Sequence, residues 1–409
     1  MRRQSIVIAA VVGLAKADSA AMGVVAPALR THLHVTPADL GILGSLASVT
    51  GALAALPAGT LVDRRHRISV LTVALVGWSV ALGLAGFARG LLLLAVARIL
   101  SGGIATVARP VAVSLAGDLF AVADRGGALA VLDTGQAVGT AICFALGALA
   151  VHLLSWQWLF FWLAAIGLAM TFLTFRLAEP PRTGPPGPPL IPVLRTLVGI
   201  RTNLIVLIAD SIGNFFFAGA ASFAVLFISD RYNMSNGEVD ALAPIFALGV
   251  IAGILVGGRV GDRLTRSRGG EERVVVAGIC QLVATALFAV ALLGPSVYTA
   301  GTFLALGAAV LGGAGPCLDA VRIDIVPAGM RGRAEAARGL LLLASGALGP
   351  VTFGLVATGF GGKSGLALRD AFLVMLGPLG TAALVLLAAV RPYQGDARAA
   401  NGPSLFPEL

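Results

Sequence analysis

A few charged and amide side chains interrupt the long apolar stretches of this sequence, and they are the residues best placed to do chemistry. They are Lys16, Asp18, Arg98, Arg109, Asp133, Gln136, Asp210, Asn214, Asp319 and Arg322. An ionised side chain near the middle of a membrane span costs at least about 2.5–3.5 kcal/mol, so each should face a cavity or a partner of opposite charge. Groups of this kind can carry a proton or bind an anionic substrate.

Asp18 is the leading candidate for a proton-binding site, because a carboxylate removed from water binds protons more readily. The alternative is a fixed structural pair with Arg109 or Lys16. Arg109 can bind an anionic headgroup or neutralise Asp18, whereas Lys16 can extend toward water or compensate charge. For Asp133 and Asp210, which we place toward the cytoplasmic ends of their spans, we expect buried pairs between helices.

Spacing along a helix adds two expectations. Arg98 and Arg109 are eleven positions apart, about three helical turns, so a continuous helix places them on one face. Asp319 and Arg322 are three positions apart, and we expect them to pair with each other before they contact a substrate.

Long apolar segments must position these side chains. The chain is 57% hydrophobic and 12% charged, whereas a soluble protein carries about 25% charged residues. Each apolar segment is long enough to cross a lipid bilayer as a helix. We expect twelve spans, at 5–28, 39–62, 68–88, 91–117, 128–153, 157–177, 202–228, 239–260, 273–293, 297–325, 334–360 and 370–390. The chain is therefore an all-α membrane protein, with the bilayer as its partner.

The distribution of basic residues predicts the orientation of these spans. Most of the 29 lysines and arginines fall in the two tails and the even-numbered turns, which places both termini in the cytoplasm by the positive-inside rule. The net charge of +9 therefore reports topology and does not indicate a nucleic-acid partner. An arginine- and alanine-rich composition with two lysines favours a bacterial cell membrane.

Nothing in the sequence indicates an enzyme. The histidines His32, His34, His66 and His152 lie in turns or at span ends, and none has metal-ligand spacing. We therefore expect no catalytic residue, no metal and no cofactor.

The two halves of the chain repeat one another. The glycine and aspartate of "GTLVDR" (59–64) recur in "GRVGDR" (258–263), and "DLFAVADRG" (118–126) matches "DIVPAGMRG" (324–332). The motifs keep their order and follow corresponding spans of each half. Such a match is typical of an internal duplication.

A proline-rich stretch, "AEPPRTGPPGPPLIP", separates six spans from six. Proline at this density forms an extended, semi-rigid spacer. We expect two pseudo-symmetric six-helix bundles at 1–177 and 202–390, a cytoplasmic linker at 178–201 and a cytoplasmic tail at 391–409.

Twelve spans in two halves, with Gly-x-x-x-Asp-Arg after the second and the eighth, resemble the major facilitator superfamily over the whole chain. In that family the turn reads Gly-x-Leu-Ala-Asp-Arg-x-Gly-Arg-Lys. This sequence keeps Gly59, Leu61, Asp63, Arg64 and Arg67, and has His66 and Ile68 in place of the second glycine and the lysine. The resemblance implies that these turns latch the halves together on the cytoplasmic side in one state and release them in the other. The implied gate residues are Gly59, Asp63, Arg64, Arg67, Asp118, Arg125, Gly258 and Asp262.

The same resemblance implies a cavity lined by the first and fourth helices of each half, with substrate near the membrane midplane. The cavity candidates are Asp18, Arg98, Arg109, Asp133, Asp210, Asn214, Asp319 and Arg322, and most of them lie on those four helices. The implied mechanism is alternating access in a secondary transporter, which we expect to be a monomer coupled to protons.

Within the superfamily, "GWSVALGLAGFARGLLLLAVARILSGG" (77–103) and "LAGDLFAVADRGGALAVL" (115–132) look like the spinster-type lipid transporters. The chain departs from that group at Ile104, where the group places a glutamate. The resemblance implies a lysophospholipid substrate, with its head on Arg109 and Asp18 and its tail among the phenylalanines at 215–217. Packing is the alternative role for those rings. A multidrug/proton antiporter is the second candidate, and a small organic-anion or sugar importer is the third.

Overall fold

The computed structural model describes residues 2–33, 37–177, 179, 181, 190–234, 243–360 and 365–401, and in these ranges it is helical, with no strand. The helices are α1 (Arg2–His32), α2 (Pro37–Arg64), α3 (Arg67–Gly86), α4 (Leu91–Ala105), α5 (Ala108–Leu119), η1 (Val122–Asp124), α6 (Arg125–Leu153), α7 (Gln157–Thr174), α8 (Leu190–Gly199), α9 (Arg201–Tyr232), α11 (Ala243–Arg268), α12 (Glu272–Leu293), α13 (Val297–Ile325), η2 (Ala328–Met330), α14 (Arg331–Gly359), α15 (Gly365–Ala388) and α16 (Val390–Asn401).

Eleven helical segments of the described residues are long and apolar enough to cross a membrane. They match the predicted spans, except that the predicted eighth span begins at residues 239–242, which lie outside the described residues. Helix α11 occupies the remainder of that span. The proline-rich residues 182–189 of the predicted linker and the end of the predicted tail, 402–409, also lie outside the described residues.

The chain forms two compact units that differ from the sequence halves at two short segments. The first unit contains Met1–Ala121, Val131–Leu194 and Ala328–Gly339, and the second contains Val122–Ala130, Arg195–Pro327 and Leu340–Leu409. The beginning of α6 therefore belongs to the second unit, and the beginning of α14 belongs to the first. Each unit takes one segment from the other half of the sequence.

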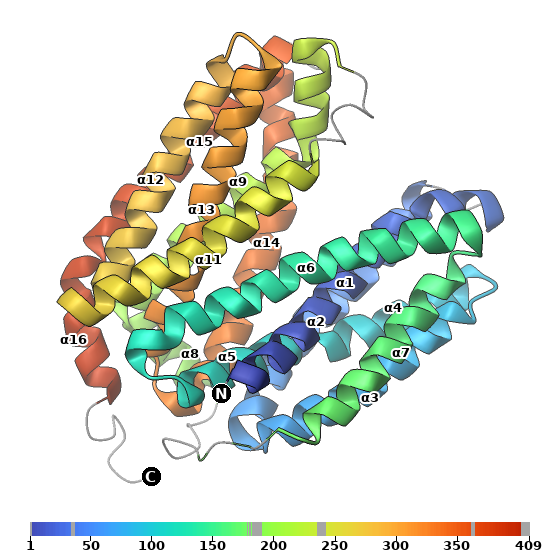
Figure 1. Ribbon diagram of the computed structural model, residues 1–409, viewed down its shortest axis with the longest axis horizontal. Coiled ribbons are helices and arrows are strands. Elements are labelled where there is room, and N and C mark those ends of the chain that lie inside the picture. The colour runs from blue at the N-terminus through green and yellow to red at the C-terminus, as the bar shows by residue number, and fades with distance from the viewer. Residues whose placement is uncertain are drawn as a thin grey trace. The chain divides into compact units, whose positions relative to one another are not determined.

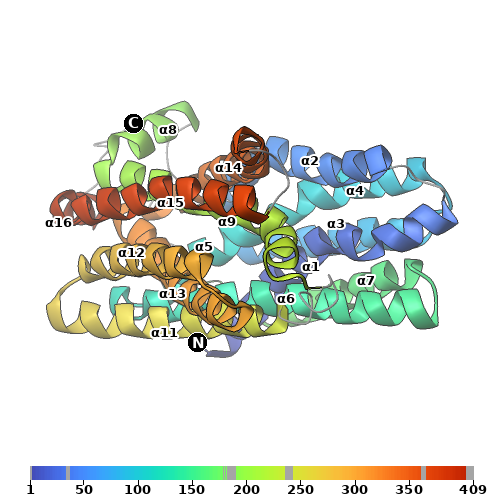
Figure 2. The same cartoon turned by 90° about the horizontal axis from the view of Figure 1, so that it is seen from above.

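In the first unit, α3 lies between α4 and α7, and α2 runs alongside α4 (Figure 2). Helices α1 and α6 approach closely at Gly135, where an added Cβ would lie 3.0 Å from the Cβ of Ala9. Small residues allow helix backbones to approach in a membrane protein, where apolar burial alone gives no force between helices.

In the second unit, α12 packs against both α13 and α15 (Figure 1). The rings of Phe216 and Phe288 stack with centroids 5.7 Å apart, and Phe216 also contacts the ring of Phe353. Phe216 therefore has the packing role, while the neighbouring Phe217 is half exposed.

The predicted fourth span is two helices, α4 and α5, separated at Thr106 and Val107. A proline in the first turn of α5, Pro110, has no backbone N–H to donate to the carbonyl one turn earlier. Arg98 and Arg109 therefore lie on two consecutive helices and not on one continuous helix. The two arginines bind different partners.

Helix α14 runs through Pro350 without ending. The neighbouring Gly349 lies against α9, where an added Cβ would be 3.0 Å from the amide nitrogen of Gly219. The glycine-proline stretch thus serves close packing between α14 and α9 in the second unit.

Candidate functional site

A buried ion pair joins α1 to α4 in the first unit. Arg98 Nη1 lies 2.5 Å from Asp18 Oδ1, and the indole N–H of Trp78 on α3 donates to Asp18 Oδ2 at 3.1 Å. Both Asp18 and Arg98 are 3% exposed. Asp18 thus pairs with Arg98 and not with Arg109 or Lys16.

A second polar group in the first unit surrounds Arg109 on α5. Its Nη1 contacts Asp133 Oδ1 at 3.0 Å, and its Nε donates to Glu335 Oε1 at 2.8 Å. Gln136 donates to Asp133 at 2.9 Å, and Arg338 donates to Glu335 at 3.0 Å. The expected pair for Asp133 is present, and its partner is Arg109.

The predicted cavity residues of the second unit form separate contacts. Asp319 and Arg322 pair with each other at 3.3 Å, as their spacing predicts, and both are buried. Asn214 Nδ2 donates to the carbonyl of Leu342 at 2.7 Å and to Ser345 Oγ at 3.1 Å. Asp210 lies half-buried on α9.

The first aspartate cluster consists of Asp63, Arg67, Asp118, Glu179, Arg331 and Arg333 in the first unit. Asp63, at the end of α2, accepts from the backbone N–H groups of Gly332 at 2.8 Å and Arg333 at 3.2 Å. The Nε of Arg333 donates to the same carboxylate at 2.7 Å. The amino end of α14 carries the positive end of the helix dipole, which favours this carboxylate.

Asp118 and Glu179 complete this cluster. Asp118 contacts Arg67 at 2.5 Å and Arg331 at 2.9 Å. Glu179 accepts from Arg67 Nε at 3.1 Å and from the backbone N–H groups of Arg67 and Ile68 at 2.9 and 3.0 Å. Burial opposes ionisation of Glu179, but these hydrogen bonds outweigh it and lower the pKa of its carboxyl.

The second aspartate cluster consists of Asp262, Arg273, Asp324, Arg125 and Tyr393 in the second unit. Asp262 accepts from the backbone N–H groups of Gly126 at 2.9 Å and Gly127 at 2.6 Å, at the start of α6. Arg273 on α12 contacts Asp262 at 2.7 Å.

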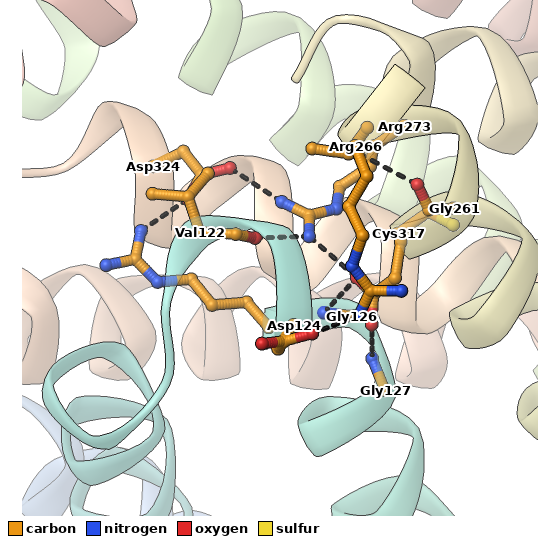
Figure 3. Close-up of polar contacts among 12 residues, drawn as sticks. Val122, Asp124, Gly126, Gly127, Gly261, Arg266, Arg273, Cys317 and Asp324 are labelled. Atoms are coloured by element: carbon orange, nitrogen blue, oxygen red, sulfur yellow. Dashed lines mark hydrogen bonds and ion pairs between the residues drawn. The ribbon is translucent and has the colours of Figure 1, made fainter. Parts of the chain in front are cut away.

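Asp324 is the second carboxylate of this cluster. Arg273 contacts it at 2.9 Å and also donates to the carbonyl of Val122, as Figure 3 shows. Arg125 pairs with the same carboxylate, and the hydroxyl of Tyr393 donates to it at 3.1 Å. Burial, followed by the charge of Asp324, raises the pKa of Tyr393.

The predicted gate residues are divided between these clusters. Gly59 and Gly258 lie where two helix backbones approach closely: an added Cβ would be 2.7 Å from the carbonyl oxygen of Gly332 in the first case and 2.8 Å from that of Gly126 in the second. Arg64 is exposed on the surface instead.

Sequence reasoning missed Glu179, Arg273, Arg331, Arg333 and Glu335. The basic ones were assigned to topology alone, yet Arg273 and Arg333 are fully buried. Glu335 could have been identified from the sequence, since it is the one carboxylate in the predicted span 334–360. Among the described residues, no group of three or more His, Cys, Asp or Glu is placed to hold a metal ion.

The helical units define a multi-pass membrane fold. The family model described as Major Facilitator Superfamily matches residues 8–303 and again 211–407. These matches cover nearly all of the sequence, so the chain belongs to the major facilitator superfamily. The protein is therefore a membrane transporter and not an enzyme.

Two named relatives transport sugar acids. The D-galactonate transporter of Escherichia coli O6:H1 is 29% identical over 165 residues, which cover 40% of this chain and 38% of that relative. The hexuronate transporter of Bacillus subtilis strain 168 is 25% identical over 397 residues, covering 92% of both chains. The first match thus spans less than half the length of the relative.

Solved structures agree on the fold. The transporter FucP has a TM-score of 0.76 at 14% identity, covering 95% of this chain and 98% of that chain. A bacterial homologue of the human lysosomal transporter Spinster has a TM-score of 0.54 at 20% identity, covering 97% of each chain. At these identities the likeness shows the fold alone, and the spinster-type subgroup stays a prediction.

Proposed function

We propose that the protein is a secondary transporter that moves a small organic anion, such as a sugar acid, together with a proton by alternating access. The names of the D-galactonate and hexuronate transporters support an acid as substrate more than a lysophospholipid. The organic-anion importer was the third candidate from the sequence, and it becomes the first here. We place the protein in a bacterial cell membrane with both termini in the cytoplasm.

The observation that carries proton coupling is the Asp18–Arg98 pair. Arg98 occupies one oxygen of Asp18 and Trp78 the other, so a single carboxylate is held from two sides in a buried place. A buried pair of this kind costs more to desolvate than a pair at the surface, and proteins gain little stability from it. A role in the transport cycle explains why the chain keeps it.

Protonation of Asp18 changes the charge of the first unit. The carboxyl becomes neutral, whereas the guanidinium of Arg98 keeps its charge because arginine does not deprotonate in proteins. The unit then gains one positive charge in a medium of low dielectric, where an anion is attracted more strongly than in water. One proton and one anion therefore bind together, which is the requirement for symport.

The two aspartate clusters supply the moving contacts of this mechanism. Residues 328–339 are bound to Asp63 and residues 122–130 to Asp262, mainly through backbone N–H groups. We infer that these contacts form in one state of the cycle and break in the other. By the distribution of basic residues they belong to the cytoplasmic side.

Uptake into liposomes tests the proposed function. Purified protein would be reconstituted with an internal pH dye, and D-galactonate, D-galacturonate, gallate and a lysophospholipid would be added in turn under an imposed pH gradient. We expect proton movement with one or more of the acids and none with the lysophospholipid. Proton movement with the lysophospholipid alone would instead make the protein a lipid transporter.

Asp18→Asn isolates the coupling step. We expect this variant to lose uptake driven by the pH gradient and to keep exchange of substrate across the membrane at equal pH. Asp230→Asn, which changes an exposed carboxylate on α9, serves as the matched control and should behave as the wild type. Unchanged gradient-driven uptake by Asp18→Asn over a pH series would defeat the proton role of Asp18.

A further inference from the structure

Four exposed arginines lie on helix α16 and on the helix ends that contact it in the second unit. They are Arg201 at the start of α9, Arg268 at the end of α11, and Arg391 and Arg398 on α16. In the part of the chain that the structure describes, the side chain of none of them takes part in a hydrogen bond or an ion pair. Their charges are therefore available to a partner outside the chain.

The turn between α11 and α12 lies against α16. Gln394 donates to Glu271 at 2.8 Å. Gly270 lies so close to the ring of Tyr393 that an added Cβ would be 3.1 Å from its Cε1 atom. Because Arg268 is two positions before Gly270, these contacts place Arg268 beside the first half of α16.

The second half of α16 lies against the start of α9. Asp396 accepts a hydrogen bond from the backbone N–H of Thr202 at 2.9 Å. Arg201 precedes Thr202 directly, and Arg398 follows Asp396 by two positions. The three segments thus form one surface around α16, which we call the arginine surface and define as Arg201, Arg268, Arg391 and Arg398.

The acidic side chains of these segments are less exposed than the arginines. Asp396, Glu271 and Glu272 are half-buried, and the first two accept the hydrogen bonds described above. Arg391 and Arg398 are seven positions apart, about two helical turns, so they point to the same side of α16. The exposed layer is therefore basic, and it favours an anion that approaches from outside.

The arginine surface lies where membrane-spanning segments begin and end. Arg201 is the first residue of one span, Arg268 is four positions before the span Glu272–Leu293, and Arg391 is three positions after the span Leu368–Ala388. Lipid headgroups occupy this level of a bilayer. Each basic side chain near an anionic membrane surface strengthens binding by about fivefold.

We propose that the arginine surface binds the phosphate headgroup of an anionic lipid, such as phosphatidylglycerol. A guanidinium matches the oxygens of a phosphate with its planar fork of donors. A free phosphate offers the same oxygens, but the bilayer holds headgroups at this level and so presents them at high local concentration. The lipid stays with the protein and is not the transported substrate, so this proposal does not depend on the proposed function.

Lipid binding at this surface also supports the second aspartate cluster. Helix α16 supplies the hydroxyl of Tyr393, which donates to Asp324 at 3.1 Å. A lipid headgroup that contacts α16 together with the ends of α9 and α11 holds Tyr393 in this position. The lipid composition of the membrane is thereby connected to a carboxylate of the second cluster.

Hydrogen–deuterium exchange of the full-length protein in lipid nanodiscs tests the proposal at the helix itself. Discs of phosphatidylcholine alone would be compared with discs of equal parts of phosphatidylcholine and phosphatidylglycerol. We expect amide exchange in residues 390–401 to be at least about fivefold slower with phosphatidylglycerol. The difference should shrink at high salt, because salt screens attraction between exposed charges.

A double variant removes the charges of α16 and leaves its other contacts in place. We expect Arg391→Gln with Arg398→Gln to lose the effect of phosphatidylglycerol. Arg391→Lys with Arg398→Lys keeps both charges and should keep most of the effect. Arg89→Gln, which removes an exposed charge from the turn before α4 in the first unit, is the matched control. In discs of phosphatidylcholine alone, all variants should exchange as the wild type does.

Four results would overturn the proposal. Equal exchange of the wild type in both kinds of disc would mean that α16 binds no anionic lipid. Slowing by phosphatidylglycerol that persists in the glutamine variant would place the lipid elsewhere. The same slowing by inorganic phosphate in phosphatidylcholine discs would assign the surface to a free anion. Faster exchange of the glutamine variant in phosphatidylcholine discs would give the arginines a structural role instead.

Discussion

The two aspartate clusters are built alike but obtain their positive charge from different places. In both, an aspartate near the end of a long helix accepts two backbone N–H groups from the start of another helix. Asp63 then takes its guanidinium from Arg333, which lies on the same segment as those N–H groups. Asp262 takes its guanidinium from Arg273, which lies on the neighbouring helix α12.

This difference changes what each carboxylate loses when its helix start moves away. If residues 328–339 leave Asp63, both the N–H donors and the Arg333 charge are lost together. If residues 122–130 leave Asp262, the N–H donors are lost but Arg273 remains. A buried carboxylate that loses its charged partner is destabilised strongly. The first cluster should therefore resist opening more than the second.

Removal of the two guanidinium groups gives the largest expected effect. Arg273 binds Asp262, Asp324 and the carbonyl of Val122, whereas Arg333 serves Asp63 and the carbonyl of Gly329. We expect Arg273→Ala to lower the unfolding free energy by about 3–5 kcal/mol, and Arg333→Ala by less, because Arg273 contacts two carboxylates and Arg333 contacts one.

Thermal unfolding in detergent, followed by tryptophan fluorescence, would measure both variants. Arg268→Ala, which removes an exposed arginine at the end of α11, is the matched control and should melt as the wild type does. A larger loss in Arg333→Ala than in Arg273→Ala would contradict the comparison.

Both clusters contain a close approach of two helix backbones, at Gly59 in the first and at Gly258 in the second. Replacement of each glycine by alanine tests whether this approach is needed. In Gly59→Ala the new Cβ would lie 2.7 Å from the carbonyl oxygen of Gly332, and in Gly258→Ala it would lie 2.7 Å from Ala130 Cβ. Overpacking of this kind costs about 1–3 kcal/mol. We expect similar losses of stability and slower transport in both variants. Gly83→Ala, where nothing lies within 4 Å, should change neither. Wild-type transport in either cluster variant would argue against the need for close approach.

Glu179 follows the last long helix of the first sequence half, and Tyr393 follows that of the second. Substitution of these residues gives the smallest expected loss of stability, and the pH dependence of that loss should differ between the two clusters. Glu179 has a lowered pKa, so its contribution to stability is complete above the ordinary value of 4.5 and is lost as pH falls through its folded value. Tyr393 has a raised pKa, so its contribution is complete below 10.0 and is lost as pH rises.

The melting temperatures of Glu179→Gln and Tyr393→Phe should therefore respond differently to pH. We expect the Glu179→Gln deficit to shrink below about pH 4.5. For Tyr393→Phe we expect a loss of about 1 kcal/mol that stays constant from pH 6 to 9, the value of a single hydrogen bond. A Glu179→Gln deficit that grew in acid would show that the lowered pKa of Glu179 is wrong.

Hydropathy predicts the spans well because a membrane helix must satisfy its backbone internally over a fixed thickness. The division of the fourth span was not predicted, although Pro110 was available as the signal. The partner of Asp18 was also wrong, because residue spacing gives the face of a helix but not the rotation of its neighbours. Arg98 was named correctly as an intramembrane charge, yet only the packing of α1 on α4 shows which carboxylate it meets.

The aspartate clusters illustrate the same limit. The repeated motif located Asp63 and Asp262, because a duplication leaves matched spacings in the sequence. It could not show that Arg333 and Arg273 supply the charges, since these residues do not occupy matched positions in the two halves. Such contacts depend on residues that are far apart in the chain, and no local pattern encodes them.

The exchange of segments between the units affects the order in which the protein can be made. Asp63 meets its backbone donor 269 positions further along the chain, and Asp118 meets Arg331 after 213 positions. At about 5–20 residues per second, synthesis takes on the order of tens of seconds to supply them. During that time the amino-terminal half is in the membrane without Arg333 for Asp63 and without Arg331 for Asp118. A fragment that ends before Ala328 therefore lacks the later segment that completes the first unit. If the two halves are expressed as separate chains, we expect each half to fold only when the other is present at the same time.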